Sequence, residues 1–265
     1  MSLSQILLVP GIGQPPLQEL QSLLFAGGQR GGMWLFSELS SLFQDTAGAT
    51  PVTTSGQTIG RISDLSGNNN HLTQSTAASR PAYDVSGTLK RGLFDGVNDF
   101  LQTAAIDFSN SDKVTVFALV RKSSDAAAGV VAEIGQSGDS SFALQGPGSP
   151  LSKRWNWNPR GTVSTETPTT DAQYNAPSTA MLTARADISG DAASLRINGS
   201  LVNSSAADLG TGNFANTSLF VGRRGGTSFP FNGLLYGLIV VNGAIPSAAK
   251  IQRVEAILQA INVGA

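Results

Sequence analysis

Short apolar runs separated by clusters of turn-forming residues make up the chain between residues 59 and 241. Runs of this length, bounded by Gly, Asn, Asp and Ser, are typical of strands in an all-β sandwich or jelly roll. The run from Val114 to Val120 is apolar at both alternating positions, as expected of a central strand covered on both faces. The predicted strands cover residues 92–94, 100–103, 114–121, 130–134, 142–145, 181–186, 194–197, 218–221 and 234–241.

Helical periodicity is confined to the two ends of the chain and one short segment, 37–43. Near the start, leucines at helical spacing follow Pro16 and precede a Gly-Gly pair, which predicts a short helix with one apolar stripe. The stripe consists of Leu17, Leu20, Leu23 and Leu24. Near the end, the pattern from Pro246 to Ile261 predicts an amphipathic closing helix.

The leucine stripe needs an apolar surface to lie on, because so short a helix is marginal alone. Either its own domain or a partner protein can supply that surface. Residues 1–32 also differ in composition from the rest of the chain, with three prolines in the first half of the segment. We therefore predict two parts, an N-terminal anchoring arm over residues 1–32 and a β domain over residues 33–265.

Composition narrows the functional classes. The chain has 265 residues, 30 Gly, no Cys and a charged fraction of 13%, against about a quarter in an average globular protein. A net charge of -1 gives no electrostatic footprint for nucleic acid or an anionic membrane. Zero Cys excludes disulfides, thiolate metal sites and Cys nucleophiles. A surface this poor in charge favours one that neighbouring subunits cover in an assembly.

Membrane insertion and export are not indicated. No run reaches the roughly 18 to 20 apolar residues that span a bilayer. The first residues lack the basic region and cleavage pattern of a signal peptide. We expect a protein made and kept soluble in the cell that synthesises it.

Several segments in order resemble a known family. They are 64–73 (DLSGNNNHLT) with Arg80 and Pro81, 93–101 (LFDGVNDFL), 194–199 (SLRING), 219–222 (LFVG) and 231–242 (FNGLLYGLIVVN). Over about residues 33 to 262 the chain resembles the laminin-G-like, concanavalin A-like jelly-roll domains of virion proteins from tailed bacteriophages. The lead-ins 24–34 (LFAGGQRGGMW) and 39–52 (LSSLFQDTAGATPV) resemble those of phage structural proteins. The resemblance implies a jelly-roll sandwich and a place on the virion.

Catalysis is the first chemistry to weigh, because the same fold includes laminarinase-type glycoside hydrolases with two Glu around an Asp on one strand. A retaining hydrolase needs two carboxyl groups about 5 to 5.5 Å apart, which alternate positions of one strand provide. None of the five glutamates here has an acidic residue two positions away. The one histidine, His71, lies among turn-forming residues, where a structural role is more common than a general base. We expect no enzyme.

The second chemistry to weigh is a metal site. Laminin-G-like domains often hold a Ca²⁺ at a loop edge, and the oxygen-bearing candidates are Asp64, Asn68, Asp95 and Asp99. The alternative is that these side chains bond their own turns. Because no EF-hand spacing exists, we expect no obligatory cofactor.

The third chemistry to weigh is glycan binding. Residues 154–160 (RWNWNPR) place Trp155 and Trp157 at strand spacing, so both rings project to one face. The rings could stack on a sugar while Arg154, Asn156 and Arg160 supply hydrogen bonds. The alternative is a tryptophan pair packed over the sheet or at a subunit contact. Arg223 and Arg224, which are adjacent to each other in the sequence, are interpreted as a solvated strand end.

The preferred hypothesis is a non-enzymatic virion structural protein. Its arm would dock onto other virion proteins of the capsid, neck or tail and display the jelly roll outward, as a homo-oligomer. Deleting residues 1–32 would then release the domain from the particle in folded form. The second hypothesis is a carbohydrate-binding module that contacts a host-surface glycan, and the third is a polysaccharide depolymerase.

Overall fold

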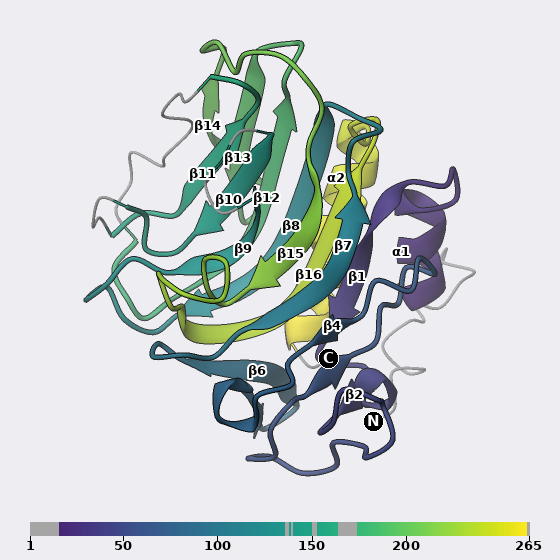
Figure 1. Ribbon diagram of the computed structural model, residues 1–265, viewed down its shortest axis with the longest axis vertical. Coiled ribbons are helices and arrows are strands. Elements are labelled where there is room, and N and C mark those ends of the chain that lie inside the picture. Colours follow the sequence, from purple (N-terminus) through teal and green to yellow (C-terminus); the bar gives the residue numbers. More distant parts are fainter. Residues whose placement is uncertain (1–15, 136–137, 139, 150–152, 164–173, 264–265) are drawn as a thin grey trace.

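A computed structural model describes residues 16–135, 138, 140–149, 153–163 and 174–263 as a sandwich of two antiparallel sheets (Figure 1). Sheet A has the order β14 (Ser200–Ser205), β13 (Ala192–Ile197), β12 (Ser178–Asp187), β8 (Lys113–Lys122), β16 (Asn232–Asn242), β6 (Leu89–Asp95) and β5 (Ala82–Ser86), and β1 (Arg30–Leu35) also pairs with β16. Sheet B has the order β11 (Asn156–Arg160), β10 (Ser141–Gln145), β9 (Val130–Ile134), β15 (Asn216–Val221), β7 (Leu101–Asp107), β4 (Leu72–Thr73), β3 (Arg61–Ile62) and β2 (Leu42–Phe43). The predicted all-β sandwich is confirmed.

The long strand β16 organises sheet A. One edge of β16 pairs along its length with β8. The other edge is shared, because β6 pairs with residues 232–235 and β1 pairs with residues 237–242. Two segments far apart in sequence therefore lie end to end against one strand, a placement that hydropathy alone does not reveal.

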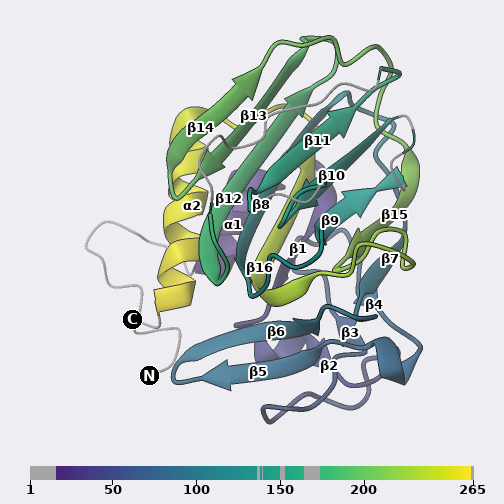
Figure 2. The same cartoon turned by 90° about the vertical axis from the view of Figure 1, so that its left-hand side faces the viewer.

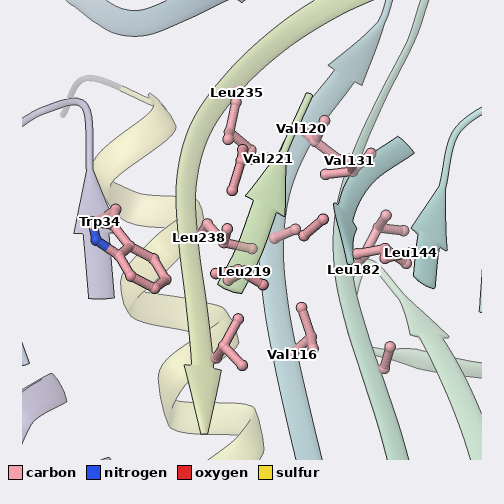
Figure 3. Close-up of a cluster of buried hydrophobic side chains, with 14 of the residues drawn as sticks. Trp34, Val116, Val120, Val131, Leu144, Leu182, Leu219, Val221, Leu235 and Leu238 are labelled. Atoms are coloured by element: carbon pink, nitrogen blue, oxygen red, sulfur yellow. The ribbon is translucent and has the colours of Figure 1, made fainter. Parts of the chain in front are cut away.

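The main core fills the space between the sheets. Figure 3 shows side chains of β8, β12 and β16 facing those of β9, β10 and β15, among them Val116, Leu182 and Leu238 against Leu144 and Leu219. All five are fully buried. Alternate residues of these strands point into this layer, which is why the period-two apolar runs predict the strands well.

A second core lies on the outer face of sheet A, where the two helices pack (Figure 2). Helix α2 (Ala248–Val263) contributes Ile251, Val254 and Leu258, and the sheet contributes Phe117 and Ile239. Because both of its faces are covered, the central strand β8 is buried at every position from Val114 to Val120, as that largely apolar run predicts. The predicted closing helix is confirmed.

The leucine stripe of the predicted arm lies on this second core. Helix α1 (Pro16–Leu24) buries Leu20 and Leu24 completely or nearly so against α2 and sheet A, and Leu17 and Leu23 pack beside them. A bidentate ion pair fastens the helices: Arg253 Nε and Nη2 donate to the two carboxylate oxygens of Glu19 at 2.6 and 2.8 Å. The chain's own domain therefore supplies the surface that the stripe requires.

The arm prediction needs a correction as a result. A boundary at residue 32 cuts β1 in half, and residues 16–32 belong to the packed domain rather than to a free anchor. Removing residues 1–32 would delete α1 and the part of β1 that pairs with Val240, Val241 and Asn242. We expect such a deletion to unfold the domain. Residues 1–15 of the predicted arm lie outside the described residues.

Leu20→Ala should lower the free energy of unfolding by about 2 to 4 kcal/mol, because it removes a fully buried side chain between two helices and a sheet. Leu17→Ala is the matched control on the same helix, and its half-buried side chain should give less than half that loss. Urea unfolding followed by circular dichroism measures both. Equal small losses would contradict the packing of α1 on its own domain.

Some sequence predictions differ from the structure. The segment 37–43 forms only a short 3-10 turn, Leu39–Ser41, followed by β2, because neighbouring strands pair with it. Strands β1, β5 and β14 were not predicted, since their residues are Gly-rich or polar and gain strand geometry from pairing. Asn198 and Gly199, a pair typical of two-residue hairpin turns, join β13 to β14 with positive φ at both residues. Among the described residues, no helix is long and apolar enough to cross a membrane.

Candidate functional site

The predicted tryptophan platform lies inside the protein. Trp155 and Trp157 are both 0% exposed and belong to the main core. The Trp157 ring centroid lies 5.4 Å from that of Phe142, and its Nε1 donates to the Arg185 carbonyl at 2.9 Å. The Trp155 ring packs so closely on Gly146 that a Cβ there would lie 2.1 Å from the ring. The two rings do share one face, but it is the inner face of sheet B, so neither can stack on a glycan.

The polar neighbours of the tryptophans have the opposite orientation. Because side chains alternate along a strand, Asn156, Asn158 and Arg160 of β11 point to the outer face of sheet B. Asn156 is buried, whereas Asn158 and Arg160 are half-buried. Arg154 precedes the strand and is also half-buried. The predicted hydrogen-bonding residues therefore face outward without their predicted aromatic partners.

Strand pairing continues this outer face into a row across five strands. The register places Gln102 of β7 opposite Phe220 of β15, then Glu133 of β9, Ala143 of β10 and Asn158 of β11. We call these five residues the polar row. It runs across the broad front of sheet B, on the far side of the sandwich from the helices (Figures 1 and 2). Its ends are accessible, since Gln102 is exposed and Phe220 and Asn158 are half-buried, while Glu133 and Ala143 are buried.

An amide cluster extends the row at the β11 end. The Nδ2 atoms of Asn156 and Asn158 both donate to Gln145 Oε1, at 3.2 and 3.0 Å. Within the described residues, the Oδ1 of Asn156 is buried and accepts no hydrogen bond. Three carboxamides thus stand together on one sheet face, with an acceptor left unused. Amides of this kind serve as both donors and acceptors for hydroxyl groups.

A buried ion pair forms the centre of the row. Arg224 Nε donates to Glu133 Oε2 at 3.0 Å and the Gly225 amide donates to Oε1 at 2.9 Å, with Glu133 0% exposed. Burial raises the pKa of Glu133, and the Arg224 and Gly225 hydrogen bonds offset part of that rise. The interpretation of Arg224 as a solvated strand end is wrong, because the loop folds back over sheet B.

The loop after β15 presents an aromatic ring beside this ion pair. The Arg224 guanidinium carbon lies 4.4 Å from the centroid of Phe229, whose ring is half-buried. Phe229 has φ of 49°, a left-handed conformation that a bulky side chain seldom adopts. Ion pairing and cation–π contact hold it there. Sequence reasoning missed this part of the site because Glu133 and Phe229 are 96 residues apart and only sheet pairing joins them.

The calcium candidates do not come together. Asp64 accepts hydrogen bonds from the Met33, Ser66 and Asn70 amides and from the Ser66 hydroxyl, at 2.8 to 2.9 Å, which occupies both carboxylate oxygens. The Nδ2 of Asn68 donates to the carbonyls of residues 29 and 31. Asp64 thus bonds its own turn, as the turn alternative predicts, and together with Asn68 it also fastens that loop to β1.

Asp95 and Asp99 lie at the other end of β16. Asp95 Oδ1 accepts from the Val97 amide at 2.7 Å, and Asp99 Oδ2 accepts from the Asp95 amide at 3.0 Å. On the β16 register, Asp95 stands opposite Asn232 and Met33 opposite Ile239, a separation of about 23 Å at 3.3 Å per residue. In the part of the chain that the structure describes, no group of three or more His, Asp or Glu side chains could hold a metal ion.

Asp99 supplies a pH-dependent prediction. It is 7% exposed, and burial, with the charge of Asp95 adding to it, raises its pKa to about 6. A carboxyl group whose folded pKa exceeds its unfolded value keeps its proton only in the folded state, so stability falls as pH rises from about 4 to above 6. Asp99→Asn should remove this dependence. The free energy of unfolding of the variant, relative to wild type, should therefore rise by about 2 kcal/mol between pH 4.5 and 7.5. Urea unfolding at the two pH values measures the gain, and parallel pH profiles would contradict it.

His71 has a structural contact. Its Nδ1 accepts a hydrogen bond from the Asp64 amide at 3.0 Å, and burial lowers its pKa. The neutral ring therefore completes the same loop that the Asp64 carboxylate fastens. This contact agrees with the structural interpretation of the histidine.

Comparison with known proteins gives the fold. No protein-family model and no curated protein matches the chain. Domain 4 of AbnA, a GH43 extracellular arabinanase from Geobacillus stearothermophilus solved with arabinotriose, has a TM-score of 0.56 and 17% identity over 86% of this chain and 98% of its own. The ligand-binding domain of botulinum neurotoxin serotype D, solved with N-acetylneuraminic acid, has a TM-score of 0.57 and 12% identity over 91% of this chain.

The sialidase of Trypanosoma rangeli, solved with the inhibitor DANA, has a TM-score of 0.53 and 11% identity over 83% of this chain. The chain spans 36% of the sialidase and 52% of the neurotoxin structure, but nearly all of the arabinanase domain. At identities this low the similarity shows a shared β-sandwich fold. The phage assignment has no counterpart among these structures and stays a prediction.

Proposed function

We propose that the protein is a carbohydrate-binding module whose glycan lies along the polar row on the outer face of sheet B. The observation that carries the proposal is the composition of that face: four carboxamides, two guanidinium groups, two half-buried phenylalanines and a small alanine floor on adjoining strands. Sugars offer hydroxyls for amides and guanidinium groups, and C–H faces for aromatic rings. The neighbouring structures solved with sugars support the same class.

We further propose that the module binds glycans without cleaving them. Hydrolysis would need a second carboxyl group within about 5 to 10 Å of Glu133. The positions beside Glu133 on this face hold Phe220 and Ala143 across the ladder, and Val131 and Gly135 along the strand. The carboxylate itself is held by Arg224 and Gly225 in a positioning role.

The virion role, the phage partners and the homo-oligomer stay predictions from the sequence resemblance. They are compatible with glycan binding, because a displayed module can recognise a host surface. The first described residues no longer support them, since α1 packs on its own domain.

A glycan array followed by calorimetric titration of the best polysaccharide tests the proposal on the full chain. Phe220→Ala and Asn158→Ala should each weaken binding at least tenfold, because each removes an accessible contact at the row. Asn232→Ala, an exposed amide on sheet A, is the matched control and should bind as wild type does. Absence of any glycan ligand, or binding indifferent to both row variants, would reject the site. Release of reducing sugar from the bound polysaccharide would reject the non-catalytic role.

A further inference from the structure

A groove on the outer face of sheet A has no part in the proposed function. It lies where β12, β13 and β14 meet the segment that leads into α2, and its volume is about 290 Å³. This places it on the opposite face of the sandwich from the polar row (Figure 2). Its lining includes the residues Arg185, Asp187, Ser194, Ser204, Ser205 and Ile245.

Strand register brings the polar groups of this groove into one line. Arg185 of β12 stands opposite Ser194 of β13, and Ser194 stands opposite Ser204 of β14. The inward positions beside them, Ala184 and Leu195, belong to the main core. The guanidinium group and two hydroxyls therefore share the outer face on three adjoining strands.

The guanidinium group of Arg185 has donors to spare. Its Nε donates to Ser194 Oγ at 2.9 Å. Within the described residues, neither Nη1 nor Nη2 makes a hydrogen bond. The Ser194 hydroxyl, having accepted from Arg185, keeps its own proton for a further acceptor. Burial lowers the pKa of Arg185 and the charge of Arg196 lowers it further, while the charge of Glu255 offsets part of that fall.

The nearby acidic groups are already paired with other cations. Asp187 accepts from Lys113 Nζ at 2.7 Å. Glu255 accepts from Arg196 Nε at 2.8 Å, and its other oxygen accepts from Arg196 Nη2 at 3.1 Å. The Arg185 guanidinium group is thus left with one hydrogen-bond partner among the described residues, the Ser194 hydroxyl.

A buried hydroxyl stands on the other side of Arg185. The register places Thr115 of β8 opposite Arg185, and Thr115 is 1% exposed. Its Oγ1 is buried and makes no hydrogen bond in the part of the chain described. A buried hydroxyl without a partner is unfavourable by about 1 to 3 kcal/mol, so native structures rarely keep one idle. Unused donors on β8, β12 and β13, namely the Thr115 hydroxyl, the Arg185 guanidinium and the Ser194 hydroxyl, therefore stand side by side on one face of the sheet.

We propose that this groove binds the carboxylate of a small acidic molecule of about monosaccharide size. The two terminal nitrogens of Arg185 take the carboxylate as a bidentate pair, a geometry that suits a planar anion. The Ser194 hydroxyl donates to the same group, and Ser204 and Ser205 contact the remainder of the ligand. The volume lies at the lower end of the roughly 300 to 1,000 Å³ typical of small-molecule sites, which excludes a long oligosaccharide. This site is independent of the polar row.

Nuclear magnetic resonance titration of the isotope-labelled full chain tests the proposal with D-glucuronate, D-glucose and inorganic phosphate as probes. D-glucuronate should shift the amide signals of residues 185–187, 192–194 and 204–205, with saturation. D-glucose, which has the same ring but no carboxylate, should leave them unchanged. Shifts with phosphate alone, or equal shifts with glucose, would overturn the carboxylate assignment.

Variants locate the charge that is responsible. Arg185→Gln should weaken D-glucuronate binding at least tenfold, and Arg185→Lys should weaken it substantially because an ammonium group cannot form the bidentate pair. Arg121→Gln is the matched control: it removes the same charge from the same face of sheet A, six positions along β8 from Thr115. Ser194→Ala, which removes a donor but no charge, covers the case in which Arg185→Gln fails to fold. Unchanged binding in Arg185→Lys and Ser194→Ala would overturn the proposal.

Discussion

Trp157→Ala is expected to lower the free energy of unfolding by about 3 to 5 kcal/mol, because it empties a fully buried ring site between the sheets. The ring also packs on Phe142, and its Nε1 hydrogen bond ties β11 of sheet B to β12 of sheet A. Losing the ring opens a cavity and leaves the Arg185 carbonyl without this donor. Equilibrium urea unfolding, followed by both circular dichroism and tryptophan fluorescence, measures the loss.

Phenylalanine variants separate the hydrogen bond from the packing. Trp155→Phe and Trp157→Phe remove the same ring volume, but the Trp155 Nε1 makes no hydrogen bond within the described residues. Trp157→Phe should therefore be the more destabilising by about 1 kcal/mol. Leu201→Ala, at a 56% exposed position, is the surface control and should change stability by less than about 0.5 kcal/mol. A stable Trp157→Ala protein would contradict the inward placement of the ring.

Glu133→Ala should lower the free energy of unfolding by about 3 to 5 kcal/mol, because removing one partner of a buried ion pair leaves the other charge uncompensated. The variant also frees Gly225 and the stacked Phe229 from their anchor, so glycan binding at the polar row should weaken as well. Chemical unfolding gives the stability, and titration with the glycan found on the array gives the binding. Glu133→Gln, which keeps the shape and an acceptor, should recover part of both.

The pH dependence of Arg224→Ala supplies an independent check. Without Arg224 the buried Glu133 loses the hydrogen bond and charge that favour its ionised form, so its pKa rises further. An acid whose pKa is raised in the folded state makes that state less stable as pH rises from the unfolded pKa to the folded pKa. The loss caused by Arg224→Ala should therefore be smaller at pH 5 than at pH 7.5. The same loss at both pH values would show that Glu133 is not buried as described.

The strand pattern and the site differ in how far sequence reasoning reaches. Nearly continuous apolar runs predict β8, β12 and β16 because both faces of these strands are covered, by sheet B on one side and by the helices on the other. Strand alternation predicts that Trp155 and Trp157 share a face, yet it cannot say whether that face is inner or outer. Polar neighbours such as Asn156 predict an exposed platform. In the structure, the alternation of side chains along β11 places the amides on the outer face and the rings on the inner face.

The sequence by itself determined the all-β sandwich, the closing helix, the turn chemistry at Asp64 and Asp95, and the absence of thiol chemistry. These features depend on local periodicity and on side chains that bond their own loops. Only the tertiary structure decided that α1 packs on its own domain, that Glu133 meets Arg224, and that Arg185 stands between Thr115 and Ser194. Each of these contacts joins residues brought together by strand order and register. That order is set by the packing of the whole chain, which no local window of residues contains.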